Sequence, residues 1–147
     1  MRQSSALPAL CLALLTCGTS PRAQPPALSA QDAWIRAIPG SEVAAVYVTL
    51  HNGSTYTISI VGVRSSRARQ AMIHESSLVN GQSRMRPHEQ LSLGPGETLR
   101  LAPGGLHIML QGLTRPLSSL EEVPVELLLG GGGSVPLAAR VRAPGVE

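Results

Sequence analysis

The chain has 147 residues, a length that suits one domain rather than two, and it is 43% hydrophobic and 14% charged, so it can bury a core. No apolar run approaches the roughly 20 residues of a membrane-spanning helix. Lys is absent, which excludes a catalytic or Schiff-base lysine. Trp34, Tyr47 and Tyr56 are the only aromatic residues, too few and too scattered to stack the bases of a single-stranded nucleic acid.

Residues 1–23 have the features of an export signal. A positive start is followed by an apolar stretch and then by small residues and prolines, and the prolines argue against a buried N-terminal helix. We predict cleavage near Ala23. The alternative is a lipoprotein signal that ends before Cys17, whose side chain would then carry the lipid. Residues 24–30 have the composition of a Pro- and Ala-rich linker, and residues 31–147 are predicted to form a single domain.

Both cysteines, Cys11 and Cys17, fall within the leader or at its boundary. The mature domain is therefore expected to have no disulfide and no thiolate ligand. Removal of Arg2 and Arg22 leaves ten arginines against nine acidic residues, so the sequence pI of 9.5 is partly a property of the leader. The remaining charge gives no electrostatic footprint for nucleic acid.

The mature chain consists of short β-branched runs separated by turn residues such as Asn52-Gly53 and Asn80-Gly81. No stretch of 11 or more residues keeps a helical period without a breaker. About nine strands with this punctuation predict an all-β fold, a Greek-key sandwich or barrel in one domain. The expected strands are 33–38, 44–50, 57–63, 70–78, 82–86, 98–101, 106–110, 123–129 and 135–141.

Two pairs of His and Met are predicted to lie on common strand faces. Asn80-Gly81 is a strong hairpin signal, because both residues tolerate positive φ. A two-residue turn there places Met85 opposite Ser76, diagonal to His74, with the two Cα atoms roughly 7–8 Å apart. His107 and Met109 lie two residues apart on another predicted strand and so share a face. The two pairs can supply four ligands to one metal ion.

The chemistry of these donors limits the choice of metal. Thioether sulfur is soft and uncharged and selects Cu(I) over zinc, magnesium or calcium. A structural zinc site would use Cys and His, and a blue-copper centre would need a Cys thiolate that the mature domain lacks. The sequence therefore predicts a carrier site for Cu(I), formed by His74, Met85, His107 and Met109.

The same four residues carry a resemblance to a family. Their spacing matches the motif H-x10-M-x21-H-x-M of the periplasmic copper chaperones known as PCuAC proteins. Residues 32–37 and 44–50 resemble the first two strands of that family, and the resemblance covers about residues 30–142. It implies a cupredoxin-like Greek-key sandwich with an exposed Cu(I) site.

The resemblance also implies a non-enzymatic role, in the periplasm or at the outer face of the cytoplasmic membrane. Copper would be delivered toward the CuA centre of cytochrome c oxidase, with the CuA-containing subunit or a Sco-type thiol protein as recipient. Gln111 stands where relatives often have another Met, and the chain ends without a His- and Met-rich tail, so no separate Cu(II) site is expected. Two alternatives are copper buffering or resistance with the same site, and a metal-free β-sandwich interaction module.

Other noticeable residues have a structural interpretation. Met72 shares a face with His74, but we expect both Met72 and Trp34 to fill the core. We expect the remaining candidates to be solvated: His51 at a strand end, His88 at the rim of the site, Glu121-Glu122 in a loop, and the cluster of Arg64, Arg67 and Arg69. For this arginine cluster, docking of an acidic partner is the alternative.

Overall fold

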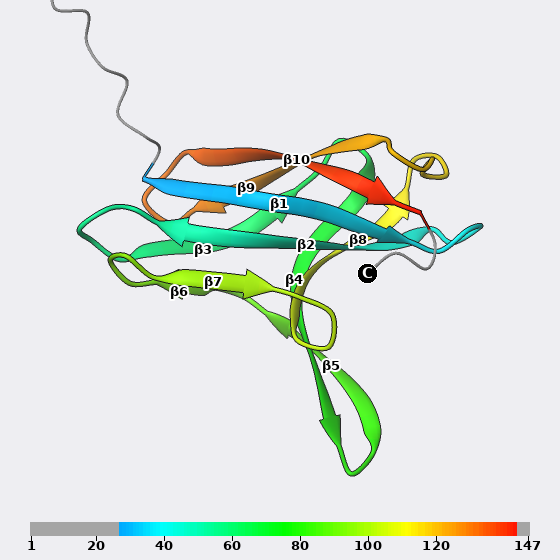
Figure 1. Ribbon diagram of the computed structural model, residues 1–147, viewed down its shortest axis with the longest axis horizontal. Helices are drawn as coiled ribbons and strands as arrows, with labels where there is room; N and C mark the ends of the chain where they lie inside the picture. Colours follow the sequence, from blue (N-terminus) through cyan, green and yellow to red (C-terminus); the bar gives the residue numbers. More distant parts are fainter. Residues whose placement is uncertain (1–26, 144–147) are drawn as a thin grey trace, which may run out of the picture.

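The computed structural model describes residues 27–143, which form ten β-strands and no helix (Figure 1). The all-β prediction is confirmed, and the described residues contain no helix that could cross a membrane. The predicted export signal lies outside the described residues. The strands are β1 (Leu28–Ala37), β2 (Val43–Asn52), β3 (Ile58–Arg64), β4 (Ala68–Val79), β5 (Gln82–His88), β6 (Leu91–Leu93), β7 (Thr98–Leu101), β8 (Leu106–Leu113), β9 (Glu122–Leu129) and β10 (Ser134–Arg142).

The observed strands differ from the expected ones at two places. Strand β6 was missed, because its three residues are too few to show an alternating pattern. Strand β1 begins at Leu28, so residues 28–30 belong to the sheet and not to the predicted linker. Leu28 pairs with Asn52 and Ala30 with Leu50, which gives the start of the domain a full set of strand partners.

The strands form one hydrogen-bonded path in the order β5-β4-β8-β2-β1-β10-β9-β3-β6, with β7 also paired to β2. Strands β1 and β10 are parallel, and the other pairs are antiparallel. One cluster of buried apolar side chains forms the core, and every strand except β5 contributes to it. The predicted sandwich is thus formed by a single sheet that folds over its own core.

Strand alternation decides which side chains face away from this core. Ile73 on β4 and Ile108 on β8 are paired in register and buried, so they belong to the core face. Because successive side chains on a strand point to opposite faces, their neighbours His74 and His107 lie on the outer face of the same two strands. The candidate ligands therefore occupy the outer face of the sheet.

The β4–β5 hairpin projects from the body of the molecule (Figure 1). Its two-residue turn has φ of 52° at Asn80 and 76° at Gly81, the left-handed conformation that the sequence predicted. The predicted register is confirmed, with Ser76 opposite Met85. Strand β5 is an edge of the sheet, which is why it tolerates Pro87.

Part of the acidic pair and of the arginine cluster that we predicted to be solvated forms ion pairs, namely Glu121, Arg67 and Arg64. Glu122 and Arg69 are exposed, as predicted. Glu121 binds the guanidinium groups of Arg67 and Arg115, and both Arg67 and Glu121 have largely buried side chains. Arg64 binds Glu126 at 2.6 Å across β3 and β9. Arg67 and Glu121 are 54 residues apart in the sequence, so no local pattern indicated their contact.

Candidate metal centre

The pairing of β4 with β8 brings the candidate ligands of two strands together. His74 is directly opposite His107, and Met72 is directly opposite Met109. Since each strand points every second residue to the same side, all four side chains lie on the outer face. Directly opposite residues have Cβ atoms about 4.5–5.5 Å apart, within contact distance for side chains of this length.

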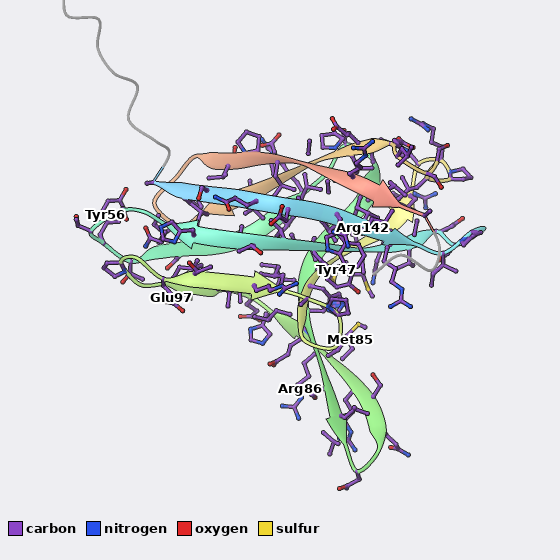
Figure 2. All side chains as sticks on the ribbon, in the orientation of Figure 1. Tyr47, Tyr56, Met85, Arg86, Glu97 and Arg142 are labelled. Atoms are coloured by element: carbon purple, nitrogen blue, oxygen red, sulfur yellow. The ribbon has the colours of Figure 1, made fainter. Side chains whose placement is uncertain are left out.

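Met85 reaches the same place from the edge strand. Its Sδ lies 3.2 Å from Nδ1 of His74, the diagonal contact that the hairpin register predicted. When two donor atoms bind one metal ion with bonds of about 2.0–2.3 Å, the distance between the two donors is similar to this separation of Nδ1 and Sδ. The side chain of Met85 is 48% exposed, and Figure 2 shows it where the hairpin leaves the body of the molecule.

A backbone contact orients His107. Its Nδ1 lies 3.0 Å from the carbonyl oxygen of Gly105. A carbonyl oxygen can only accept, so Nδ1 carries the hydrogen and Nε2 keeps the lone pair that would bind a metal. The rings of His107 and His74 are edge to face, with centroids 6.0 Å apart, and His107 is only 4% exposed. The imidazole is therefore held in one tautomer and in a restricted orientation.

A cleft of about 250 Å³ opens over these side chains, and Met85, His107 and Met109 line it together. Ala45 is directly opposite Met109 on β2, and its small side chain leaves room for the cleft. Gln111 donates a hydrogen bond from Nε2 to Sδ of Met109 at 3.2 Å. The structure thus brings all four predicted site residues together, three as lining of the cleft and His74 in contact with Met85.

The donors at this position are two imidazoles and two thioethers. Within residues 27–143, no group of three or more His, Cys, Asp or Glu side chains is arranged to hold a metal ion. Hard cations that require several oxygen ligands do not match this arrangement. Neutral nitrogen and soft sulfur donors fit Cu(I).

The local environment keeps His74 in the form that can bind a metal. Burial, and to a smaller degree the neighbouring charge of His107, lower the pKa of His74. Both effects disfavour the charged imidazolium. Only neutral imidazole coordinates metals, so the site retains a free donor at His74 below the pH at which an exposed histidine would be protonated.

Several residues around the site were missed or misassigned from the sequence. Tyr47 forms a wall of the cleft, and Trp34, which we expected in the core, is half-buried on the outer face in contact with Tyr47. Met72, also expected in the core, is half-buried on the outer face beside Met109. His88 binds Glu75 with Nε2 and Oε2 3.1 Å apart. Alternation along the strand could have placed Tyr47 and Ala45 on one face, but the sequence gives no sign that this face lies beside β8.

We predict that the His74 imidazole in the metal-free chain titrates with a midpoint below about 6.5, the ordinary value for histidine. The unfolded chain then takes up this proton at higher pH than the folded chain. The free energy of unfolding should therefore fall as the pH drops below about 6.5, and level off below the folded pKa of His74. NMR titration of the ring protons gives the midpoint, and urea unfolding gives the stability.

In the same experiments His74→Gln, which removes the titrating group, should flatten this part of the stability profile. A His74 midpoint at or above 6.5 would contradict the role assigned to burial.

The fold matches solved structures of copper-binding proteins. The apo PCuAC domain from PmoF1 matches with a TM-score of 0.66 and 24% identity, over 80% of this chain and 95% of that domain. Apo-DR1885 from Deinococcus radiodurans has a TM-score of 0.62 and 29% identity, over 95% of this chain and 96% of its own. Its Cu(I) form has a TM-score of 0.56 and 30% identity, over 80% and 77%. The cupredoxin-like fold is confirmed.

Sequence comparison identifies the family. "Putative lipoprotein Lxx21020" of Leifsonia xyli subsp. xyli is 34% identical over 124 residues, which span 84% of this chain and 74% of the relative. The family model described as "Putative lipoprotein LpqE-like" matches residues 28–141, a range that includes all four candidate ligands. The chain therefore belongs to the LpqE-like family.

Proposed function

We propose that the chain is an exported, non-enzymatic carrier of Cu(I), which it binds as cargo through His74, Met85, His107 and Met109. The observation that carries this proposal is the convergence of two imidazoles and two thioethers on one outer face, with Nδ1 of His74 3.2 Å from Sδ of Met85. The existence of a Cu(I) form of DR1885, 30% identical to this chain, supports the same metal.

The donor set suits release as well as binding. All four ligands are neutral, so they leave the charge of Cu(I) uncompensated, whereas thiolates of an acceptor neutralise it and bind the soft ion more strongly. Met85 is half-exposed and lies on the projecting hairpin, so an incoming thiolate can reach the ion from that side. Transfer then proceeds by stepwise exchange of ligands, and the acceptor thiols give up their protons to solvent. The oxidation state of copper does not change.

The recipient that we propose is the CuA-containing subunit of cytochrome c oxidase or a Sco-type thiol protein. This part of the proposal is supported by the PCuAC motif and by the likeness to PCuAC domain structures. A buffering protein could use the same donors, so delivery and buffering are separated by the deletion experiment below.

We propose that the mature chain is anchored to the membrane through a lipid on Cys17. The names of the curated relative and of the matching family, both lipoproteins, support this location. Only nine residues separate Cys17 from Ala27, where the described domain begins, and nine residues span at most about 30 Å. An anchor at Cys17 would hold the copper site close to acceptors that are themselves in the membrane.

We predict that removal of any donor weakens Cu(I) binding at least tenfold, which is about 1.4 kcal/mol. The variants are His107→Ala, Met85→Leu and Met109→Leu, where leucine keeps the apolar volume and removes the sulfur. Titration with Cu(I) against a competing colorimetric chelator measures the affinity. Met72→Leu, on the same outer face, is the matched control and should bind within twofold of the parent. Parent-like affinity of His107→Ala or Met109→Leu would disprove the site.

Delivery is tested in a strain of the source organism that lacks this chain, grown at limiting copper. We expect low CuA loading and low oxidase activity, restored by the parent chain. The chain with Cys17→Ser should be found outside the membrane fraction and should restore oxidase activity less well than the parent, because it has lost the lipid anchor. Normal CuA loading in the deletion strain would reject delivery in favour of buffering. Recovery of the Cys17→Ser chain in the membrane fraction would reject the anchor.

A further inference from the structure

A second hollow lies on the outer face beside the copper cleft. It has a volume of about 640 Å³, and its lining includes Trp34, Thr49, Arg100 and Arg142. Trp34 lines this groove, Tyr47 lines the copper cleft, and the two rings are in contact with centroids 4.5 Å apart. One aromatic pair therefore forms the wall between the groove and the cleft.

An irregularity in β1 creates the groove. Between Gln31 and Trp34 the pairing with β2 shifts, and Asp32 within this bulge has φ of 52°. A bulge inserts a residue and turns the following side chains to the opposite face. Trp34 is thereby directed outward onto Tyr47, and the guanidinium carbon of Arg142 lies 4.1 Å from the centre of the Trp34 ring.

Some arginines of the described residues are paired with carboxylates, whereas the two arginines of the groove are not. Arg64, Arg67 and Arg115 all bind carboxylates within the chain. No carboxylate of the described residues forms an ion pair with Arg100 or Arg142. Arg100 is directly opposite Thr49 in the β2–β7 ladder, so a guanidinium and a hydroxyl face the groove side by side. Asp32 is the one acidic residue in the lining, which leaves the groove with a positive balance.

We propose that this groove docks an acidic segment of the protein that receives the copper; the inference rests on the proposed function. Arginine forks and a threonine hydroxyl bind carboxylates, and the indole of Trp34 packs against the aliphatic parts of Glu or Asp side chains. Only the Trp34–Tyr47 pair separates an acceptor bound in this groove from the cleft that Met85 and His107 line. The thiolates of the acceptor are thus brought to the open side of the copper cleft. Complementary charge also speeds encounter between the two proteins.

Trp34 is the only tryptophan of the chain, so its fluorescence reports occupancy of the groove directly. The metal-free full mature chain is titrated with acetylated tetraglutamate and with acetylated tetraglutamine. We expect a saturable change with tetraglutamate alone, weakened at least tenfold by Arg100→Glu. Arg84→Glu is the matched control, because Arg84 is exposed and lies opposite Ser77, on the hairpin face away from Met85. It should bind tetraglutamate within threefold of the parent.

Three results would overturn the docking groove. One is the absence of a saturable change with tetraglutamate, and another is an equal response to tetraglutamine. The third is a loss in Arg84→Glu as large as that in Arg100→Glu, because binding would then follow the net charge of the protein and not the groove.

A second measurement separates this inference from the function on which it rests. The Cu(I)-loaded chain is mixed with a synthetic two-cysteine peptide that carries either an acidic or a neutral tail. We expect transfer to the acidic peptide to be at least fivefold faster, with the advantage lost in Arg100→Glu and the Cu(I) affinity unchanged. Equal rates for the two peptides would reject the groove alone. Transfer to neither peptide would reject the carrier function, whatever the fluorescence titration shows.

Discussion

The candidate site depends on the register of β4 against β8. Ile73 and Ile108 are paired and buried, and this apolar contact fixes which face of the two strands is turned to the core. His74 and His107 must then meet on the outer face. A slip of one residue on either strand would turn its histidine into the core and its isoleucine into solvent, at a high cost in buried apolar area. The burial of the core thus also specifies the face that carries the candidate ligands.

The surrounding residues keep the candidate donors of this face in a form that suits the proposed Cu(I) ion. The carbonyl oxygen of Gly105 fixes the tautomer of His107, and burial lowers the pKa of His74, so both rings can offer a lone pair. Gln111 holds the sulfur of Met109, and Ala45 leaves the opening above it. Met85 alone is brought in by a projecting edge hairpin. The most exposed candidate ligand is therefore also the one that lies on the strand with no core side chain.

Local signals in the sequence predicted this hairpin and its register. A two-residue Asn80-Gly81 turn leaves one way to pair the flanking strands, and alternation then groups His74 with Met85. The pairing of β8 with β2 and β4 joins residues far apart in the chain and leaves no local trace. Tyr47, Ala45 and the wall of the cleft could therefore not be assigned beforehand.

The orientation of Trp34 could also not be predicted from the alternation of residues in the sequence. Strict alternation from the buried Leu28 would turn position 34 inward, but the bulge between Gln31 and Trp34 inserts one residue and turns Ile35 inward instead. The same bulge leads to two neighbouring hollows on one face, each with a proposed role. Trp34 and Arg142 border a basic groove, and Tyr47 borders the metal cleft. An acceptor protein and the copper ion can then occupy neighbouring positions without competing for side chains.

The most direct test of the account is X-ray absorption at the copper edge of the Cu(I)-loaded chain. Two nitrogen and two sulfur neighbours in the parent, with one sulfur lost in Met85→Leu, are the result that the geometry of His74, Met85, His107 and Met109 predicts. A copper environment of nitrogen and oxygen alone, or one that keeps both sulfurs in Met85→Leu, would contradict it.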